Sequence, residues 1–248
     1  MSGHTMVYLF ACLLALATIC LRLTRWRSQP KSRPLTIVVA LLIVSTVLRH
    51  PVVLESDWLD DQLPENLHLA NITDLLGDLV TAAAAGYICS LVAQAWGFEH
   101  LRPWIVRIFT ADALVLLMLW AVSDAPHTHI KYVDQLGGPA LLYSYVAATT
   151  VLISHLAVLA SVLIARLSRK TRLALLPMVL GAFLATIGNL IRIGSHVAPS
   201  IFADLREHFG WPIILATTLL YTASGLIGYF AYPRRAKSAV GPQPGTVR

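Results

Sequence analysis

Charged residues are scarce in this chain of 248 residues. Asp, Glu, Lys and Arg together make up 13% of it, whereas 56% is hydrophobic and the mean hydropathy is +0.67. Because soluble domains carry roughly 25% charged residues, this composition excludes an ordinary soluble domain. Cysteine is also rare: Cys12, Cys20 and Cys89 all fall within apolar runs. Their odd number and apolar surroundings exclude a disulfide framework.

Catalytic signatures are missing as well. The last apolar run, residues 211–231, contains no Lys for the Schiff base of a retinal pigment and no paired His of the seven-helix zinc hydrolases. There is no His-Glu-x-x-His run for a zinc protease. The Pro-Gln pair typical of seven-helix sugar carriers occurs only outside the apolar runs, at Pro242–Gln243. We therefore predict a non-enzymatic protein with no metal site and no cofactor.

What the chain does contain is a series of seven apolar stretches. A helix needs ~20 residues to cross ~30 Å of hydrocarbon, and each stretch has about that length. The sequence predicts an all-α bundle of seven transmembrane helices over residues 1–232. The predicted spans are residues 5–23, 35–54, 71–95, 104–122, 139–165, 173–194 and 211–231.

The basic residues predict how this bundle is oriented. Fifteen of the 19 Lys and Arg residues fall in alternate connecting segments and the tail, on one side of the zig-zag. Positive residues in short loops stay in the cytoplasm, so we expect the N-terminus outside and the C-terminus inside. The expected location is the cytoplasmic membrane, with residues 233–248 forming a disordered, basic cytoplasmic tail. Anionic inner-leaflet lipids are the expected partners of these basic segments, and nucleic acid is not.

Local patterns add three expectations. Asn71 is predicted to cap the third helix, with Asp74 in its first turn. Small residues at a spacing of four along residues 82–90 predict that this helix is central and closely packed. Residues 201–209 follow Pro199 and are predicted to form a short, separate amphipathic helix on the outer surface.

Charged groups at membrane depth are costly and need partners or water. Counted along the predicted helices, one set of polar residues falls in the outer half of the membrane: Arg49, Asp74, Asp78, Asn189 and Arg192. Two carboxylates and two guanidiniums form a neutral set in which Arg can make paired contacts. The set is interpreted either as a clasp between helices or as the floor of an outward-facing polar pocket.

Asp112 and His155 form a second predicted set, because both fall near mid-membrane. An Asp that contacts a His can fix one imidazole tautomer or pass a proton. The pair is interpreted either as a proton relay or as a hydrogen bond that orders two helices.

The stretch Asn71-Ile72-Thr73-Asp74-Leu75-Leu76-Gly77-Asp78-Leu79 and the later Tyr143-Ser144-Tyr145 resemble the membrane half of uncharacterised actinobacterial multi-pass proteins, some labelled transporters. Similar stand-alone bundles occur in actinophages. The resemblance implies a seven-helix transporter-like protein. It differs from many members in lacking their appended cytoplasmic domain and in having Asp78 where His is frequent.

The leading hypothesis is therefore a non-enzymatic membrane protein that handles or senses a small polar or ionic ligand from the outer face. The alternative is a sensor or interaction protein that signals to a partner at its cytoplasmic face, including a phage exclusion or immunity factor. An intramembrane enzyme is the third and weakest alternative. A polar lining that is continuous from the outer cluster towards Asp112 and His155 would favour transport, and a dry apolar seal would favour interaction.

Overall fold

The computed structural model describes residues 3–55, 69–128, 130, 133–165 and 169–231, and the regular structure in these residues is all helical. The predicted tail, 233–248, lies outside them. The long helices are α1 (Gly3–Leu23), α2 (Arg33–Leu48), α4 (Ile72–Ala95), α5 (Arg102–Ala121), α6 (Gly138–Ile164), α7 (Arg169–Val197) and α8 (Pro199–Ala231). The short elements are α3 (Pro51–Glu55) and the 3-10 turns η1 (Pro30–Ser32), η2 (Glu99–Leu101), η3 (Ala125–His127) and η4 (Val133–Leu136).

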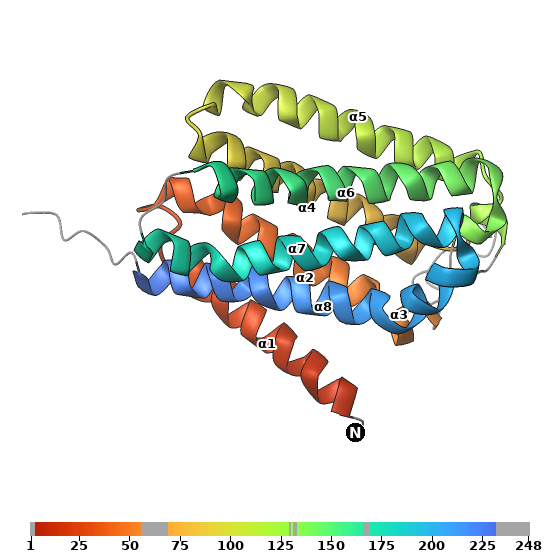
Figure 1. Ribbon diagram of the computed structural model, residues 1–248, viewed down its shortest axis with the longest axis horizontal. Helices are drawn as coiled ribbons and strands as arrows, with labels where there is room; N and C mark the ends of the chain where they lie inside the picture. The colour runs from red at the N-terminus through yellow and green to blue at the C-terminus, as the bar shows by residue number, and fades with distance from the viewer. Residues whose placement is uncertain (1–2, 56–68, 129, 131–132, 166–168, 232–248) are drawn as a thin grey trace, which may run out of the picture.

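The long helices form one bundle in which successive helices run in alternate directions (Figure 1). We call the end at which α1 begins the N-end and the end at which α8 finishes the C-end. The N-end carries α3, η3, η4 and the junction between α7 and α8, whereas η1, η2 and the α6–α7 connection lie at the C-end (Figure 1).

The protein has the character of a multi-pass membrane protein. Six of the described helices, all the long ones except α2, are long and apolar enough to cross a membrane by length and composition. α2 is apolar but shorter. Large apolar side chains on the outside of the bundle are exposed, including Leu13 (65%), Met118 (65%) and Leu163 (86%). Lipid would cover such a surface, which water would solvate poorly.

α4 lies at the centre of the bundle, as the small-residue pattern predicts. It contributes Leu75 and Ala82 to a core shared with α5 and α6, and Ala84 and Ile88 to a core shared with α2, α6, α7 and α8. At Gly86 an added Cβ would lie 3.0 Å from the Phe109 ring, so only glycine allows α5 to approach this closely.

The second predicted span, residues 35–54, is wrong at its C-terminal end. α2 finishes at Leu48, Arg49 is its C-cap, and the chain starts a new short helix at Pro51. Proline lacks an amide hydrogen and disfavours helical backbone in the residue before it, which is His50 here. The apolar run is therefore interrupted, and Arg49 lies at a helix end.

The separate surface helix predicted for residues 201–209 is also wrong. α8 is continuous from Pro199 to Ala231, although its first turns curve away from the axis of the rest (Figure 1). These turns pack against α7: an added Cβ on Gly194 would lie 2.8 Å from the Phe202 ring. Contact with α7 holds the segment in the bundle, and amphipathic periodicity alone does not reveal this.

Asn71 precedes α4 but does not cap it with its side chain. Its backbone is left-handed, with φ of 58°, a conformation that asparagine tolerates better than most residues. The side-chain amide donates hydrogen bonds to the carbonyl oxygens of Ala125 (2.8 Å) and Thr128 (2.6 Å). The capping prediction is thus incorrect, and Asn71 instead ties the α5–α6 connection to the start of α4.

Candidate functional site

Asp78 is the centre of a buried ion cluster near the N-end. Its side chain is 1% exposed. Arg192 of α7 donates from Nη1 to Oδ1 (3.0 Å) and from Nη2 to Oδ2 (3.2 Å), and Arg49 forms a second ion pair with the same carboxylate. The forked guanidinium matches a carboxylate in this two-point contact. The structure therefore brings together Asp78, Arg49 and Arg192 from α4, the end of α2, and α7.

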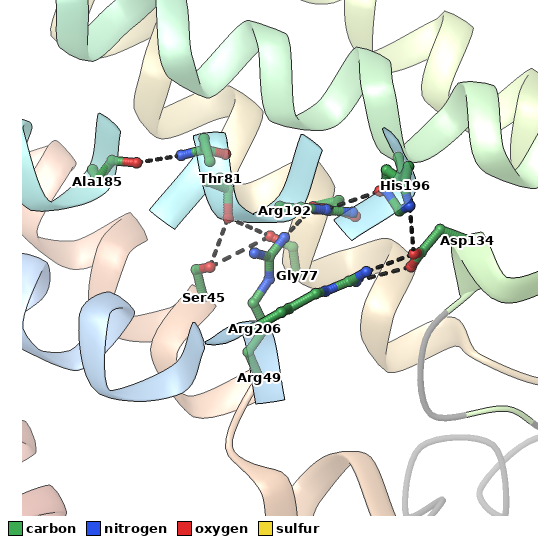
Figure 2. Close-up of polar contacts among 12 residues, drawn as sticks. Ser45, Arg49, Gly77, Thr81, Asp134, Ala185, Arg192, His196 and Arg206 are labelled. Atoms are coloured by element: carbon green, nitrogen blue, oxygen red, sulfur yellow. Dashed lines mark hydrogen bonds and ion pairs between the residues drawn. The ribbon is translucent and has the colours of Figure 1, made fainter. Parts of the chain in front are cut away.

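The local backbone makes room for this cluster. Gly77 precedes Asp78, and a Cβ at this position would lie 3.1 Å from Nε and 3.2 Å from Cγ of Arg49. The missing side chain lets Arg49 cross the surface of α4 to reach Asp78. One turn further along, Thr81 shares a 2.6 Å hydrogen bond with Ser45 of α2, so polar contacts join the two helices at the ion pair and one turn beyond it (Figure 2).

A polar network continues from Arg192 towards the loops of the N-end. Nε of Arg192 donates to Ser144 Oγ (2.9 Å), which lies 3.1 Å from His196 Nε2. The other ring nitrogen of His196, Nδ1, lies 3.2 Å from Asp134 Oδ2. Arg206 of α8 donates to both oxygens of Asp134, at 2.5 and 2.8 Å (Figure 2). The network links η4 to α6, α7 and α8 through two arginines, a serine, a histidine and an aspartate.

Asp134 is anionic in this network at neutral pH. Burial by itself would raise the pKa of Asp134, but hydrogen bonds from Arg206 and the positive charge of that residue outweigh burial and lower the pKa below its usual value. The carboxylate thereby offsets the charge of Arg206 at the N-end of the bundle.

Sequence reasoning missed Asp134, His196 and Arg206 as members of one network. Arg206 was predicted on a detached surface helix, and Asp134 falls in a connection whose path the sequence does not reveal. One signal was present in α8. Residues 206, 210, 213, 214, 217 and 218 follow the spacing of one helix face, and all of them line the cavity described next.

A cavity of about 220 Å³ lies beside the ion cluster. Pro51, Leu54 and Glu207 line it at the N-end, and Val151 and His155 of α6 line it further into the bundle. The predicted site residues that line it are Arg49, Asp74, Asn189, Arg192 and His155. The hydroxyl-bearing residues Ser45, Thr81, Thr217 and Thr218 line it as well. The cavity thus joins the outer set of predicted residues to His155.

Several hydrogen-bond acceptors on the cavity wall have no partner among the described residues. Asp74 makes no hydrogen bond or ion pair there, and Asn189 uses only its amide nitrogen, which donates to the Ala185 carbonyl of its own helix (2.8 Å). His155 Nδ1 lies 2.8 Å from the Val151 carbonyl, so this nitrogen carries the proton of the neutral ring. Nε2 of His155 is then an acceptor, and it is buried without a partner.

Two hydrogen-bond donors on the same wall also lack an acceptor. Nε of Arg49 and the indole Nε1 of Trp211 are buried without hydrogen-bond partners among the described residues. Buried polar atoms in folded proteins are nearly always paired with protein or water. The wall therefore offers both hydrogen-bond acceptors and hydrogen-bond donors that a ligand in the cavity could pair with.

The predicted contact between Asp112 and His155 does not form. Asp112 Oδ1 accepts a hydrogen bond from Thr150 (2.8 Å), whereas His155 bonds Val151 and packs edge-on against Tyr221 with ring centroids 5.8 Å apart. The two residues share a depth in the bundle, but they belong to different surroundings. The cavity wall includes His155 and not Asp112.

No protein-family model, curated protein or solved structure matches this chain. The resemblance to actinobacterial and actinophage membrane proteins therefore stays a prediction, and the function must be argued from the cavity and its surroundings.

Proposed function

We propose that this chain is a seven-helix protein of the cytoplasmic membrane, with its N-terminus outside, that binds a small polar ligand from the outer face in order to transport or sense it. The protein is not an enzyme in this proposal. The N-end is then extracellular, and the arginine-rich C-end faces the cytoplasm, in accordance with the distribution of basic residues.

α2 is the seventh crossing in this proposal. Its 16 residues span ~24 Å, somewhat less than the ~30 Å of the hydrocarbon core. α1 finishes at the C-end and α4 starts at the N-end (Figure 1), so the chain must pass from one end of the bundle to the other between them. α2 covers that path, and the ion pair of Arg49 with Asp78 offsets the cost of a charged residue at its short end.

The observation that carries the proposal is the cavity between the ion cluster and His155. A simple clasp between helices would need only the contacts among Asp78, Arg49 and Arg192. It would not need a space of about 220 Å³ lined by unpaired polar atoms. Small-ligand sites are concave, mostly apolar and marked by a few convergent polar groups, as this one is.

An apolar cluster lies beyond the cavity, on its C-end side. Val38, Ile88, Val158 and Tyr221 are buried there, and Leu35 and Leu91 pack against them. Leu35 and Leu91 also line a second pocket at the C-end, so the cluster separates the two spaces. This arrangement supports a site that is closed towards the cytoplasm, as in a sensor or in one state of a carrier, rather than an open channel.

The wall chemistry favours a ligand without net charge. With both carboxylates ionised, Asp74 and Asp78 balance Arg49 and Arg192. Asp74, Asn189 and His155 offer acceptors, whereas Arg49 Nε and the Trp211 indole offer donors. A zwitterion or another small molecule with both donors and acceptors would satisfy both kinds of group, whereas a simple anion or cation would leave one kind unfilled.

Thermal unfolding of the purified protein with a zwitterionic, a cationic and an anionic probe tests the proposal. A ligand that binds only the folded protein raises its Tm. We expect glycine to raise the Tm, methylammonium and acetate to raise it much less, and the Asp74→Asn variant to lose the glycine effect. Asp204→Asn, at an exposed position of α8, is the matched control. Equal shifts for all three probes, or none, would contradict the proposed ligand class. Uptake of labelled glycine into proteoliposomes would then distinguish transport from sensing.

A further inference from the structure

The second pocket, of about 630 Å³, lies at the C-end of the bundle. It is formed by the last turns of α1, α4 and α8, the first turns of α2 and α7, and η1 with the turn that precedes it. Its lining includes two arginines, Arg22 and Arg25, and the leucines Leu35, Leu91 and Leu175. No described residue of the lining is acidic.

Arg22 is buried in this pocket wall without a counter-charge. The residue is 6% exposed, and its guanidinium donates to three neutral oxygens: Thr36 Oγ1 at 2.9 Å, the Gly225 carbonyl at 2.8 Å and the Ser32 carbonyl at 2.8 Å. A guanidinium has five N–H donors, so two remain for a further acceptor. The charge itself has no acidic partner among the lining residues.

Arg25 adds a second positive charge to the same wall. Its Nη1 donates to the Tyr229 carbonyl (2.6 Å), and its guanidinium carbon lies 3.6 Å from the centroid of the Tyr229 ring. These contacts hold the side chain against the end of α8 beside the pocket. In the sequence, Glu99 is the only acidic residue in the connecting segments 24–32, 96–101 and 165–168.

The arginines at the two ends of the bundle differ in their acidic partners. At the N-end, Arg49, Arg192 and Arg206 each contact an aspartate. At the C-end, the buried charge of Arg22 faces no acidic residue in the described pocket lining. An uncompensated positive charge at low exposure is costly, and an external anion would remove that cost.

We propose that the C-end pocket binds the phosphate group of an anionic lipid. Arg22 and Arg25 would contact the phosphate, for which guanidinium groups are well suited. Leu35, Leu91 and Leu175 supply an apolar wall beside them that fits an acyl chain. A soluble phosphate ester has the same phosphate group but no acyl chain to pack against the apolar wall. We therefore assign the site to a lipid. The site requires no particular function of the N-end cavity.

Thermal unfolding of the full-length protein in detergent tests this site. We expect added phosphatidylglycerol to raise the Tm by several degrees more than phosphatidylcholine does. Arg22→Gln should abolish that difference. Arg102→Gln, an exposed arginine at the same end and outside the pocket, should leave the difference unchanged.

Arg22 also joins α1 to α2 and α8 through its hydrogen bonds, so Arg22→Gln could fail to fold. A second variant therefore tests the site without removing this arginine. Gly228 lines the pocket, and an added Cβ there would meet only Arg22 Nη1, at 3.9 Å. Gly228→Leu should therefore fill the pocket without removing charge, and the preference for phosphatidylglycerol should be lost.

Three results would overturn the proposal. An equal effect of both lipids on the wild-type protein would mean that no anionic lipid is recognised. A loss in Arg102→Gln as large as that in Arg22→Gln would mean that the attraction is diffuse electrostatics. Stabilisation by glycerol 1-phosphate equal to that by phosphatidylglycerol would assign the site to soluble phosphate esters.

Discussion

Asp78 is the residue on which the polar interior of the N-end depends, because a single carboxylate accepts contacts from two arginines. Arg49 and Arg192 have side-chain exposures of 14% and 16%, against 1% for Asp78. Without Asp78, each guanidinium would keep its charge in a poorly hydrated place and lose its acidic partner. Removing one partner from a buried ion pair costs more than the intact pair contributes.

The first prediction is that Asp78→Asn destabilises the protein by about 3–5 kcal/mol, the usual cost of leaving a buried charge unpaired. The measurement is the free energy of unfolding in a denaturing-detergent titration, with Asp204→Asn as the exposed control. An unchanged free energy of unfolding in Asp78→Asn would mean that water or lipid headgroups already solvate the two arginines.

The second prediction concerns pH and Asp134. Because Arg206 lowers the pKa of Asp134, the pair contributes stability that is complete above the ordinary Asp pKa of about 3.9 and is lost as the pH falls through the lower folded-state pKa. The difference in Tm between wild type and Asp134→Asn should therefore be constant from about pH 5 to pH 7. It should shrink below about pH 4. A difference that persists unchanged to about pH 3 would contradict the assigned ion pair.

At the scale of elements, α7 and α8 pack closely against each other. Glycines of α7 allow this approach: an added Cβ would lie 2.9 Å from Ile213 Cγ2 at Gly188 and 2.8 Å from the Phe202 ring at Gly194. The same packing turns Arg206 towards Asp134 and places one face of α8 on the cavity. The geometry of the site therefore depends on two glycines, of which Gly188 lines the cavity and Gly194 lies outside it.

The third prediction is that Gly194→Ala destabilises the protein by about 1–3 kcal/mol, because the new methyl group has no space against Phe202. Gly210→Ala in α8 is the matched control, since nothing lies within 4 Å of an added Cβ there. That control should be neutral or stabilising by up to ~1 kcal/mol, the helix-propensity gain of Ala over Gly. Equal losses in both variants would mean that the close approach of α7 and α8 is incorrect.

At the scale of the whole molecule, the sequence predicts the positions of the helices better than it predicts the contacts between them. Apolar length defines α1, α4, α5 and α6 to within a few residues, because lipid imposes that length on any spanning helix. The same reasoning overlooks the break before Pro51 and the continuity of α8, since a local turn and contacts with α7 decide these ends.

The candidate site is predictable only in part for a related reason. Depth along a helix can be counted from the sequence, and it groups Asp78 with Arg49 and Arg192 correctly. Depth does not give the direction in which a side chain points around its helix axis. Asp112 and His155 have similar depths and yet contact different partners. Asp134 and Arg206 meet only because a loop and the start of α8 fold onto α7, which no local pattern records.

The whole molecule thus combines a polar cavity at the N-end, an apolar cluster in the middle and a basic pocket at the C-end. This order of layers agrees with the two proposals made above, a ligand site at the N-end and a lipid site at the C-end. Its orientation and the accessibility of the cavity are the properties on which the proposed function depends.

Labelling of single cysteines with a membrane-impermeant thiol reagent, applied to intact cells, tests both properties at once. The background replaces Cys12, Cys20 and Cys89 with Ser, and the reporter is Asn189→Cys on the cavity wall. His127→Cys at the N-end and Glu99→Cys at the C-end are exposed controls for the two sides. We predict external labelling of Asn189→Cys and His127→Cys and none of Glu99→Cys. Labelling of Glu99→Cys alone, or protection of Asn189→Cys while His127→Cys reacts, would contradict an outward-facing ligand cavity.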